Sequence, residues 1–148
     1  MRFSRKSRYG LSALIDLAVN SKTEQVSLCS IAKRNSISLQ YLEQIFASLR
    51  RAGIVKSIKG SQGGYFLNAG PSEITVAQVL EALEGDYHIE DEKVPEGSSS
   101  PGISTTIQTR IIDEVNHKLD EILKNITLAD LEKDYLENEA YNQNMYYI

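Results

Sequence analysis

Residues 27–67 have the sequence SLCSIAKRNSISLQYLEQIFASLRRAGIVKSIKGSQGGYFL, and this stretch decides the fold. Ser27 is placed to cap a short helix, because its side-chain oxygen can accept a free backbone N–H of the first turn. That helix has apolar residues at Leu28, Ile31 and Ala32. Residues 35–37 form a turn, and Ser38 is a second N-cap. The stretch therefore begins as two helices joined by a tight turn.

The second helix has an apolar and a polar face, and a β-hairpin follows it. Its apolar residues recur every three or four positions, at Leu39, Leu42, Phe46 and Leu49. Gly53 closes the helix as a left-handed C-cap. The β-branched run 54–58 leads to the glycine-rich turn 59–64 and to the returning segment 65–67, which is the pattern of a hairpin. We predict a mainly α fold with a small β-hairpin wing, that is, a winged helix-turn-helix.

Two helices and a wing in this order indicate a nucleic-acid-binding unit. The major groove of B-DNA admits an α-helix, and side chains near the N-terminus of the second helix reach base edges. The candidate contacts on this helix are Ser38, Gln40, Tyr41, Glu43, Gln44 and, farther along, Arg50. On the wing, Lys59 would neutralise phosphate, while the glycines would let the backbone approach the sugar-phosphate edge. These glycines are Gly60, Gly63 and Gly64. Ser27 completes the set, and an ordinary surface hairpin is the alternative.

Charge is divided unevenly between the two halves of the chain. Residues 1–70 contain 11 Lys and Arg against 3 Asp and Glu, a net charge of +8, whereas residues 71–148 contain 5 against 17, a net charge of −12. The overall charge of −4 hides a basic footprint whose phosphate contacts would be steeply salt-dependent. Further candidate phosphate ligands are Lys33, Arg34, Arg51 and Lys56. The acidic half should face away from DNA.

Four cations cluster at the start of a predicted first helix that Ser4 caps. They are Arg2, Arg5, Lys6 and Arg8. Because the helix macrodipole is positive at this end, the cluster is unfavourable unless an anion lies nearby. It indicates phosphate contact or, alternatively, a solvated helix end.

Composition divides the chain into four parts. Residues 1–85 form the winged helix-turn-helix domain, whose last helix has capping-box spacing between Thr75 and Gln78. Residues 86–102 are rich in acidic residues, Ser, Gly and Pro, and predict a flexible loop. Residues 103–135 contain a long helix and a short C-terminal helix, whose start is capped by Thr127 with Asp130. Residues 136–148 form a C-terminal tail.

The long helix carries an apolar stripe for which the rest of the chain offers little cover. It consists of Ile107, Ile111, Val115, Leu119, Ile122 and Ile126. A second copy of the same helix across a two-fold axis is the economical partner, which makes this a dimerisation helix. A homodimer would place two recognition helices about 34 Å apart and predict a palindromic operator in double-stranded DNA. Packing on its own subunit is the alternative.

Several classes of protein are disfavoured. The longest mainly apolar stretch, 11–19, is shorter than the ~20 residues that cross a bilayer, and no signal-peptide pattern is seen, so we expect a cytoplasmic protein. The absence of a catalytic triad, phosphate-binding loop or metal signature disfavours an enzyme. His88 and His117 are too few and too far apart to suggest a metal site, so no metal or cofactor is expected. The single Cys29 is expected to be a buried structural thiol.

Several segments together carry a family resemblance. They are Lys6–Leu11, Ser38-Leu39 with Tyr41–Gln44, Leu49-Arg50, Gly53, Lys59-Gly60 with Gly63–Tyr65, Leu83–Gly85 and Ile126–Leu131. These segments resemble the bacterial Rrf2 family of winged-helix regulators. The resemblance implies a dimer that binds operators through the second helix and the wing and usually represses transcription, with Tyr41, Glu43 and Lys59 at positions used for DNA contact. Family members commonly have Arg where Lys59 stands, and Lys lacks the bidentate geometry of Arg for guanine.

Two features separate this chain from the iron–sulfur members of the family. Those members have three cysteines after the wing, whereas residues 86–110 contain none, so an iron–sulfur cluster is not expected. The segment Glu139–Tyr141 and the terminal Met145, Tyr146, Tyr147 and Ile148 are similar to the C-terminus of a cluster-free subgroup, the cysteine-metabolism repressors of Gram-positive bacteria.

The resemblance of the tail implies a partner enzyme, cysteine synthase (O-acetylserine thiol-lyase). Ile148 with a free carboxylate would enter the active site of that enzyme, a known mode of peptide capture, and O-acetylserine would compete for the pocket. Accumulated O-acetylserine would then release the enzyme, weaken operator binding and derepress sulfur-assimilation genes. Alternatively, the tail packs on the partner subunit or lies disordered.

Two further alternatives stay open. A cluster-free regulator of the same family could sense a small molecule or redox state directly, in the redox case through Cys29. A winged helix can also serve as a protein-interaction module that does not bind DNA.

Overall fold

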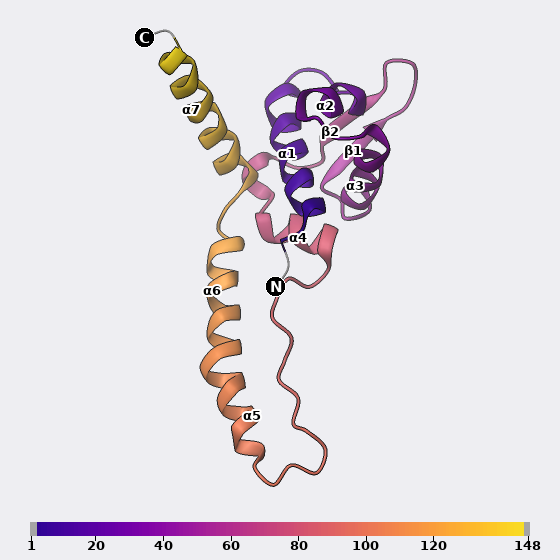
Figure 1. The fold of residues 1–148 in the computed structure, drawn as a ribbon. Coiled ribbons are helices and arrows are strands. Elements are labelled where there is room, and N and C mark those ends of the chain that lie inside the picture. The colour runs from indigo at the N-terminus through magenta and orange to yellow at the C-terminus, as the bar shows by residue number, and fades with distance from the viewer. Residues whose placement is uncertain (1–2, 147–148) are drawn as a thin grey trace.

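A computed structural model describes residues 3–146 (Figure 1). The winged-helix domain contains α1 Arg5–Asn20, α2 Leu28–Asn35, α3 Leu39–Arg51, β1 Val55–Ile58, β2 Gly64–Leu67, a 3-10 turn Pro71–Glu73 and α4 Val76–Glu84. The remainder contains α5 Pro101–Ile107, a π-helical segment Gln108–Ile112, α6 Asp113–Leu123 and α7 Leu128–Tyr146. The first three are continuous and form the predicted long helix, which ends before Ile126. The predicted fold class, mainly α with a two-stranded wing, is confirmed.

Serine residues fix the starts of the first three helices. The side-chain oxygens of Ser4, Ser27 and Ser38 each accept the backbone N–H three residues ahead, at 3.4, 3.2 and 3.1 Å. Between α2 and α3 the chain turns through Ser36, whose φ of 54° lies in the left-handed region. Gly53, with a φ of 78°, ends α3 as predicted. Local capping therefore defines the helix-turn-helix.

The core of the domain lies between α1, α2, α3 and the wing. Fully buried side chains include Leu14, Leu17, Ile31, Leu42, Ile45, Phe46 and Leu49. Leu39, predicted to share the core face of α3, is instead 40% exposed. It is the first residue of α3 and precedes the first buried residue of that helix, Leu42. The prediction was therefore wrong for Leu39.

The wing is a short antiparallel ladder that extends to a third segment. β1 pairs with β2 from Val55 opposite Leu67 to Ile58 opposite Gly64. Val26, just before α2, exchanges two backbone hydrogen bonds with Tyr65, at 3.1 and 2.8 Å. The wing is thus tied to the start of the helix-turn-helix.

The segment after α4 makes contacts that its composition does not predict. Over residues 86–92 the chain runs along α6 and the π-helical segment (Figure 1), joined to them by side-chain hydrogen bonds. These residues form no helix or strand, as expected of a loop, and the flexibility predicted for 86–102 stays a prediction. Polar side chains of the long helix supply hydrogen-bond partners that the segment itself does not provide.

The C-terminal helix is also longer than predicted. Thr127 and Asp130 exchange the expected reciprocal hydrogen bonds at its start, at 2.9 and 3.2 Å. The helix then continues to Tyr146, so the predicted short helix followed by a tail from residue 136 is wrong for the described residues. Residues 128–146 contain no Gly or Pro and many good helix formers, which lets the helix propagate.

Within residues 3–146 the structure has no helix with the length and apolar character that a bilayer crossing requires.

Candidate nucleic-acid interface

The N-terminal half of α3 presents a polar face to solvent. Gln40, Glu43 and Gln44 are exposed and, at spacings of three and four residues, share one side of the helix. Ser38 is exposed as well, although its side-chain oxygen is occupied by the cap to Tyr41 N–H. The structure thus brings together four of the five residues predicted near this end of α3.

Tyr41, the fifth, is half-buried rather than freely exposed. Its ring meets the ring of Tyr9 on α1 edge to face, with centroids 5.8 Å apart and planes at 82°. Tyr9 was not among the candidate contacts predicted from the sequence. The contact fixes the orientation of Tyr41 relative to the rest of the polar face.

The three wing glycines were all predicted to let the backbone approach DNA, but the structure gives them different roles. Gly60 is exposed with a φ of 121°, so the tip needs glycine for its backbone, and Lys59 beside it is exposed. A Cβ on Gly63 would lie 2.5 Å from the Ile58 carbonyl oxygen, and one on Gly64 would lie 2.7 Å from that of Val26. The protein's own backbone therefore already requires glycine at Gly63 and Gly64, whether or not DNA approaches them.

The predicted cations are not equally available. Arg5, Arg8 and Arg50 are exposed, Lys6 is half-buried, and the Arg8 guanidinium lies 4.7 Å from the centre of the Phe3 ring. Arg34, in contrast, donates two hydrogen bonds of 2.9 and 2.7 Å to the Asp16 carboxylate. The pair holds α2 against α1 and occupies two N–H groups of the guanidinium, so Arg34 is less available than the other arginines, and its contact with phosphate stays a prediction. Arg2 lies outside the described residues.

Ser27 and Cys29 lie at the start of α2. The Ser27 hydroxyl is half-buried and occupied by its cap to Ser30, which explains its place in the sequence without a DNA contact. Cys29 is exposed, so the expectation of a buried thiol was wrong. Direct redox sensing by Cys29 stays a prediction.

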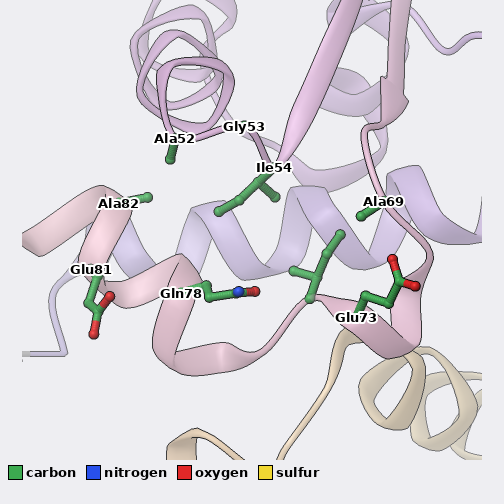
Figure 2. A pocket seen from close by; sticks show the side chains of 9 residues that line it. Ala52, Gly53, Ile54, Ala69, Glu73, Gln78, Glu81 and Ala82 are labelled. Carbon is green, nitrogen blue, oxygen red and sulfur yellow. The ribbon is translucent and has the colours of Figure 1, made fainter.

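A hollow lies at the opposite end of α3 from Ser38. Small or aliphatic side chains of Ala52, Ile54, Ala69 and Ala82 form its interior, and Glu73, Gln78 and Glu81 surround it (Figure 2). The two carboxylates would repel phosphate. The hollow is therefore not part of the basic interface.

A hydrogen-bonded cluster joins residues 86–92 to the long helix; we call it the clasp and define it by Asp86, Tyr87, His88, Asn116 and Asp120. His88 lies between Asp86 and Asp120, with ring nitrogens 2.6 and 2.8 Å from their oxygens, and the buried Tyr87 donates its hydroxyl proton to Asp120. Asn116 pairs with the backbone of Ile89 through bonds of 2.8 and 3.0 Å. The sequence did not predict the clasp, because the hydrogen bonds that join its two segments connect residues 27 to 33 positions apart.

The clasp shifts the ionisation of its members. The hydrogen bond to Asp86, followed by that to Asp120, raises the pKa of His88 above its ordinary value. Burial, reinforced by the hydrogen bond to Asp120, raises the pKa of Tyr87. Hydrogen bonds from Tyr87 and His88 lower the pKa of Asp120. The carboxylates of Asp86 and Asp120, one beside each ring nitrogen, thus stabilise the protonated form of His88 relative to a free histidine.

The predicted dimerisation stripe divides into two parts. Leu119 and Ile126 pack, with Leu123, against the buried cluster of α4 and Tyr87 in the same subunit. Ile111, Val115 and Ile122 are 54%, 39% and 54% exposed, and Ile107 is half-buried. Intramolecular packing therefore accounts for Leu119 and Ile126 and leaves Ile111, Val115 and Ile122 largely uncovered.

Comparison with known proteins identifies the family. The model of the Rrf2 family, described as an iron-dependent transcriptional regulator, matches residues 3–134 of the chain. The chain belongs to the Rrf2 family. An Rrf2 relative, the HTH-type transcriptional regulator IscR of Klebsiella pneumoniae (strain 342), is 36% identical over 131 residues, which cover 88% of this chain and 79% of that protein.

Two solved structures support the same assignment. CymR (YrzC), the global cysteine regulator of B. subtilis, matches this Rrf2 chain with a TM-score of 0.74 at 36% identity, over 90% of this chain and 97% of that one. T. potens IscR matches with a TM-score of 0.68 at 38% identity, over 91% and 88%. The chain is therefore a DNA-binding transcriptional regulator of the Rrf2 family, and the expectation that it is not an enzyme is confirmed.

Iron, which the family description mentions, does not fit the residues of this Rrf2 protein. Cys29 is the single cysteine of the chain. Among residues 3–146, no three His, Cys, Asp or Glu side chains are grouped so that they could hold a metal ion. Both ring nitrogens of His88 are already paired within the clasp. The donor set for an iron–sulfur cluster is missing.

Proposed function

We propose that two copies of this Rrf2 chain bind a palindromic operator and repress transcription, with α3 in the major groove and the wing on the adjacent backbone. The observation that carries the proposal is the exposed polar face of Gln40, Glu43 and Gln44, which follows Ser38 on α3. Lys59 and Gly60 are exposed at the turn of the wing. Base edges require polar groups of this kind, and phosphates require cations.

The long helix supports the dimer. Ile111 and Val115 are separated by one helical turn and leave apolar surface in water. A two-fold pairing of this helix would cover both residues in each subunit, and a dimer would read two half-sites about 34 Å apart.

Duplex selection tests DNA binding. The protein is used to select its operator from a pool of random duplexes, and its affinity for that operator is then measured across a salt series. Arg50→Glu and Lys59→Glu should each weaken operator binding at least about tenfold, because each removes a phosphate contact and adds repulsion. Lys133→Glu on α7 makes the same charge change at an exposed residue outside the proposed interface and should bind like the parent protein.

A winged helix that only contacts proteins would give a different result. The selection would then yield no preferred duplex, and neither charge reversal would change retardation of DNA. A selected palindrome bound with a two-to-one ratio of chain to duplex supports the dimeric regulator.

We also propose cysteine and sulfur-assimilation genes as the targets, with cysteine synthase as the partner that conveys the signal. The support is the resemblance of the C-terminal residues to the cysteine-metabolism repressors and the match to CymR. The helix α7 leads away from the winged-helix domain (Figure 1), and Tyr141 and Met145 are 64% and 58% exposed on it. Tyr147, Ile148 and the side chain of Tyr146 lie outside the described residues.

Calorimetric titration against cysteine synthase tests this partner. The full chain and a version lacking Met145–Ile148 are titrated with and without O-acetylserine. Binding that needs these residues and is abolished by O-acetylserine supports the cysteine-regulator proposal. If the full chain does not bind, cysteine synthase is not its partner, while the DNA-binding function still stands.

A further inference from the structure

Leu39 is an exposed aliphatic side chain at the end of α3 that we place in the major groove. It is the first residue of the helix and is 40% exposed, next to the exposed Ser38 and Gln40. Every residue of α3 is described, and among its large apolar side chains Leu39 alone is exposed to this degree. An isolated exposed leucine is ordinary on a protein surface, and Leu39 is distinguished by its position at the start of α3.

DNA binding would remove this side chain from water. The base edges in the major groove are hydrogen-bond donors and acceptors, and an aliphatic group against one of them leaves it unpaired at a cost. The 5-methyl group of thymine is the exception, because it is the apolar feature that the groove presents. A leucine in this position therefore tolerates one kind of base edge better than the others.

We propose that Leu39 reads a thymine methyl group in each operator half-site and is a specificity-determining residue of this protein. The inference rests on the proposed placement of α3 in the major groove. It gives the operator a definite chemical property, an A·T pair at a fixed step of each half-site. Neighbouring bases are left to the polar face of α3.

The proposal is tested by removing the methyl group from either side of the contact. In the selected operator, each thymine of a half-site is replaced in turn by deoxyuridine, which lacks only the methyl group. One replacement should weaken binding of the parent protein about fourfold, the effect of uncovering one methyl-sized contact. Leu39→Ala should bind the unmodified operator with a similar loss and should show little further loss with deoxyuridine.

Two variants serve as controls. Leu39→Met keeps a flexible apolar side chain at the helix start and should retain most of the response to deoxyuridine. Val94→Ala shortens an aliphatic residue between α4 and α5 that is 55% exposed and belongs neither to the recognition helix nor to the wing. It should keep the full response. Thermal melting of each variant establishes that it is folded.

The outcomes separate this inference from the proposed function. If the parent protein selects no duplex, the DNA-binding function fails and the Leu39 contact fails with it. If an operator is selected but no half-site specifies an A·T pair, the inference alone is overturned. It is likewise overturned if deoxyuridine weakens the parent and Leu39→Ala equally, since the methyl group would then act through the shape of the DNA.

Discussion

Individual residues at the interface have tasks that their types alone do not reveal. Gly63 and Gly64 were expected to make room for DNA, yet their neighbours are the protein's own carbonyl groups. Arg34 was expected to bind phosphate, yet it holds Asp16. In each case a contact within the protein, rather than the type of residue, determines what the residue does. Substitutions at these positions should therefore affect stability before they affect DNA binding.

Gly64→Ala should destabilise the protein by about 2 kcal/mol, because the new Cβ would displace Val26 and weaken its two hydrogen bonds to Tyr65. Urea unfolding measures the change. Gly70→Ala is the matched control, since a Cβ there meets no atom within 4 Å and its φ of −63° suits alanine. Equal stability of the two variants would contradict the assignment of Gly64 to backbone packing.

Tyr9→Leu should weaken operator binding about fivefold while leaving binding to unrelated duplexes unchanged, because it removes the ring edge that orients Tyr41. Tyr9→Phe keeps the ring and should bind like the parent protein. Retardation assays with both kinds of duplex give the ratio. A loss that is the same for every duplex would mean that Tyr9 serves the core alone.

Among the elements, the long helix has the most varied contacts. One part of it packs on α4, another binds the segment 86–92 through the clasp, and a third remains apolar and uncovered. The π-helical segment Gln108–Ile112 lies within it, and Gln108 there accepts a hydrogen bond of 2.7 Å from the Glu92 backbone. The clasp therefore joins the segment that follows the winged-helix domain to the long helix and helps to fix their relative orientation.

The clasp should make stability depend on pH near neutrality. The pKa of His88 is raised in the folded protein, so its stabilisation is complete below the unfolded value of about 6.5 and is lost as pH rises through the folded value. Thermal melting temperatures should accordingly fall as the pH rises above about 6.5. His88→Gln should flatten this dependence. His117→Gln, which changes an exposed histidine on α6, should keep it.

The whole molecule combines a basic winged-helix half, on which the polar face of α3 is exposed, with an acidic second half. The two are joined through α4, through the long helix and through α7, which packs beside α1 and forms an ion pair of 2.6 Å between Glu132 and Lys22. Because the recognition helix and the apolar stripe belong to one connected structure, dimerisation would set the separation of two recognition helices.

Ile111→Glu with Val115→Glu should raise the dimer dissociation constant at least about 100-fold, since it would bury unpaired carboxylates at the two-fold contact. Sedimentation equilibrium measures the constant, and operator affinity should fall with it. Thr109→Glu introduces the same side chain at an exposed position of the long helix, separated from Ile111 by about half a turn, and should remain dimeric. A double variant that sediments like the parent would remove these residues from the interface.

The sequence by itself determined the local structure and the family. Capping serines, helical periodicity and the glycine at the end of α3 are local signals, and they predicted the helix-turn-helix and wing correctly. The charge difference between the two halves is likewise a property of composition. Motifs along the chain indicated the Rrf2 family, and the comparisons confirmed it.

Only the tertiary structure decided which of the predicted interface residues are exposed and which are engaged in contacts within the protein. Four features depend on how residues distant in sequence pack together. They are the exposure of Leu39, the ion pair of Arg34 with Asp16, the contact of the Tyr9 ring with Tyr41 and the hydrogen bonds of His88 in the clasp. Periodicity predicts which face of a helix is apolar, but it does not tell where the neighbouring elements stop covering that face. The division of the long helix between intramolecular packing and uncovered surface has the same physical reason, because burial depends on what packs opposite a residue as well as on the residue itself.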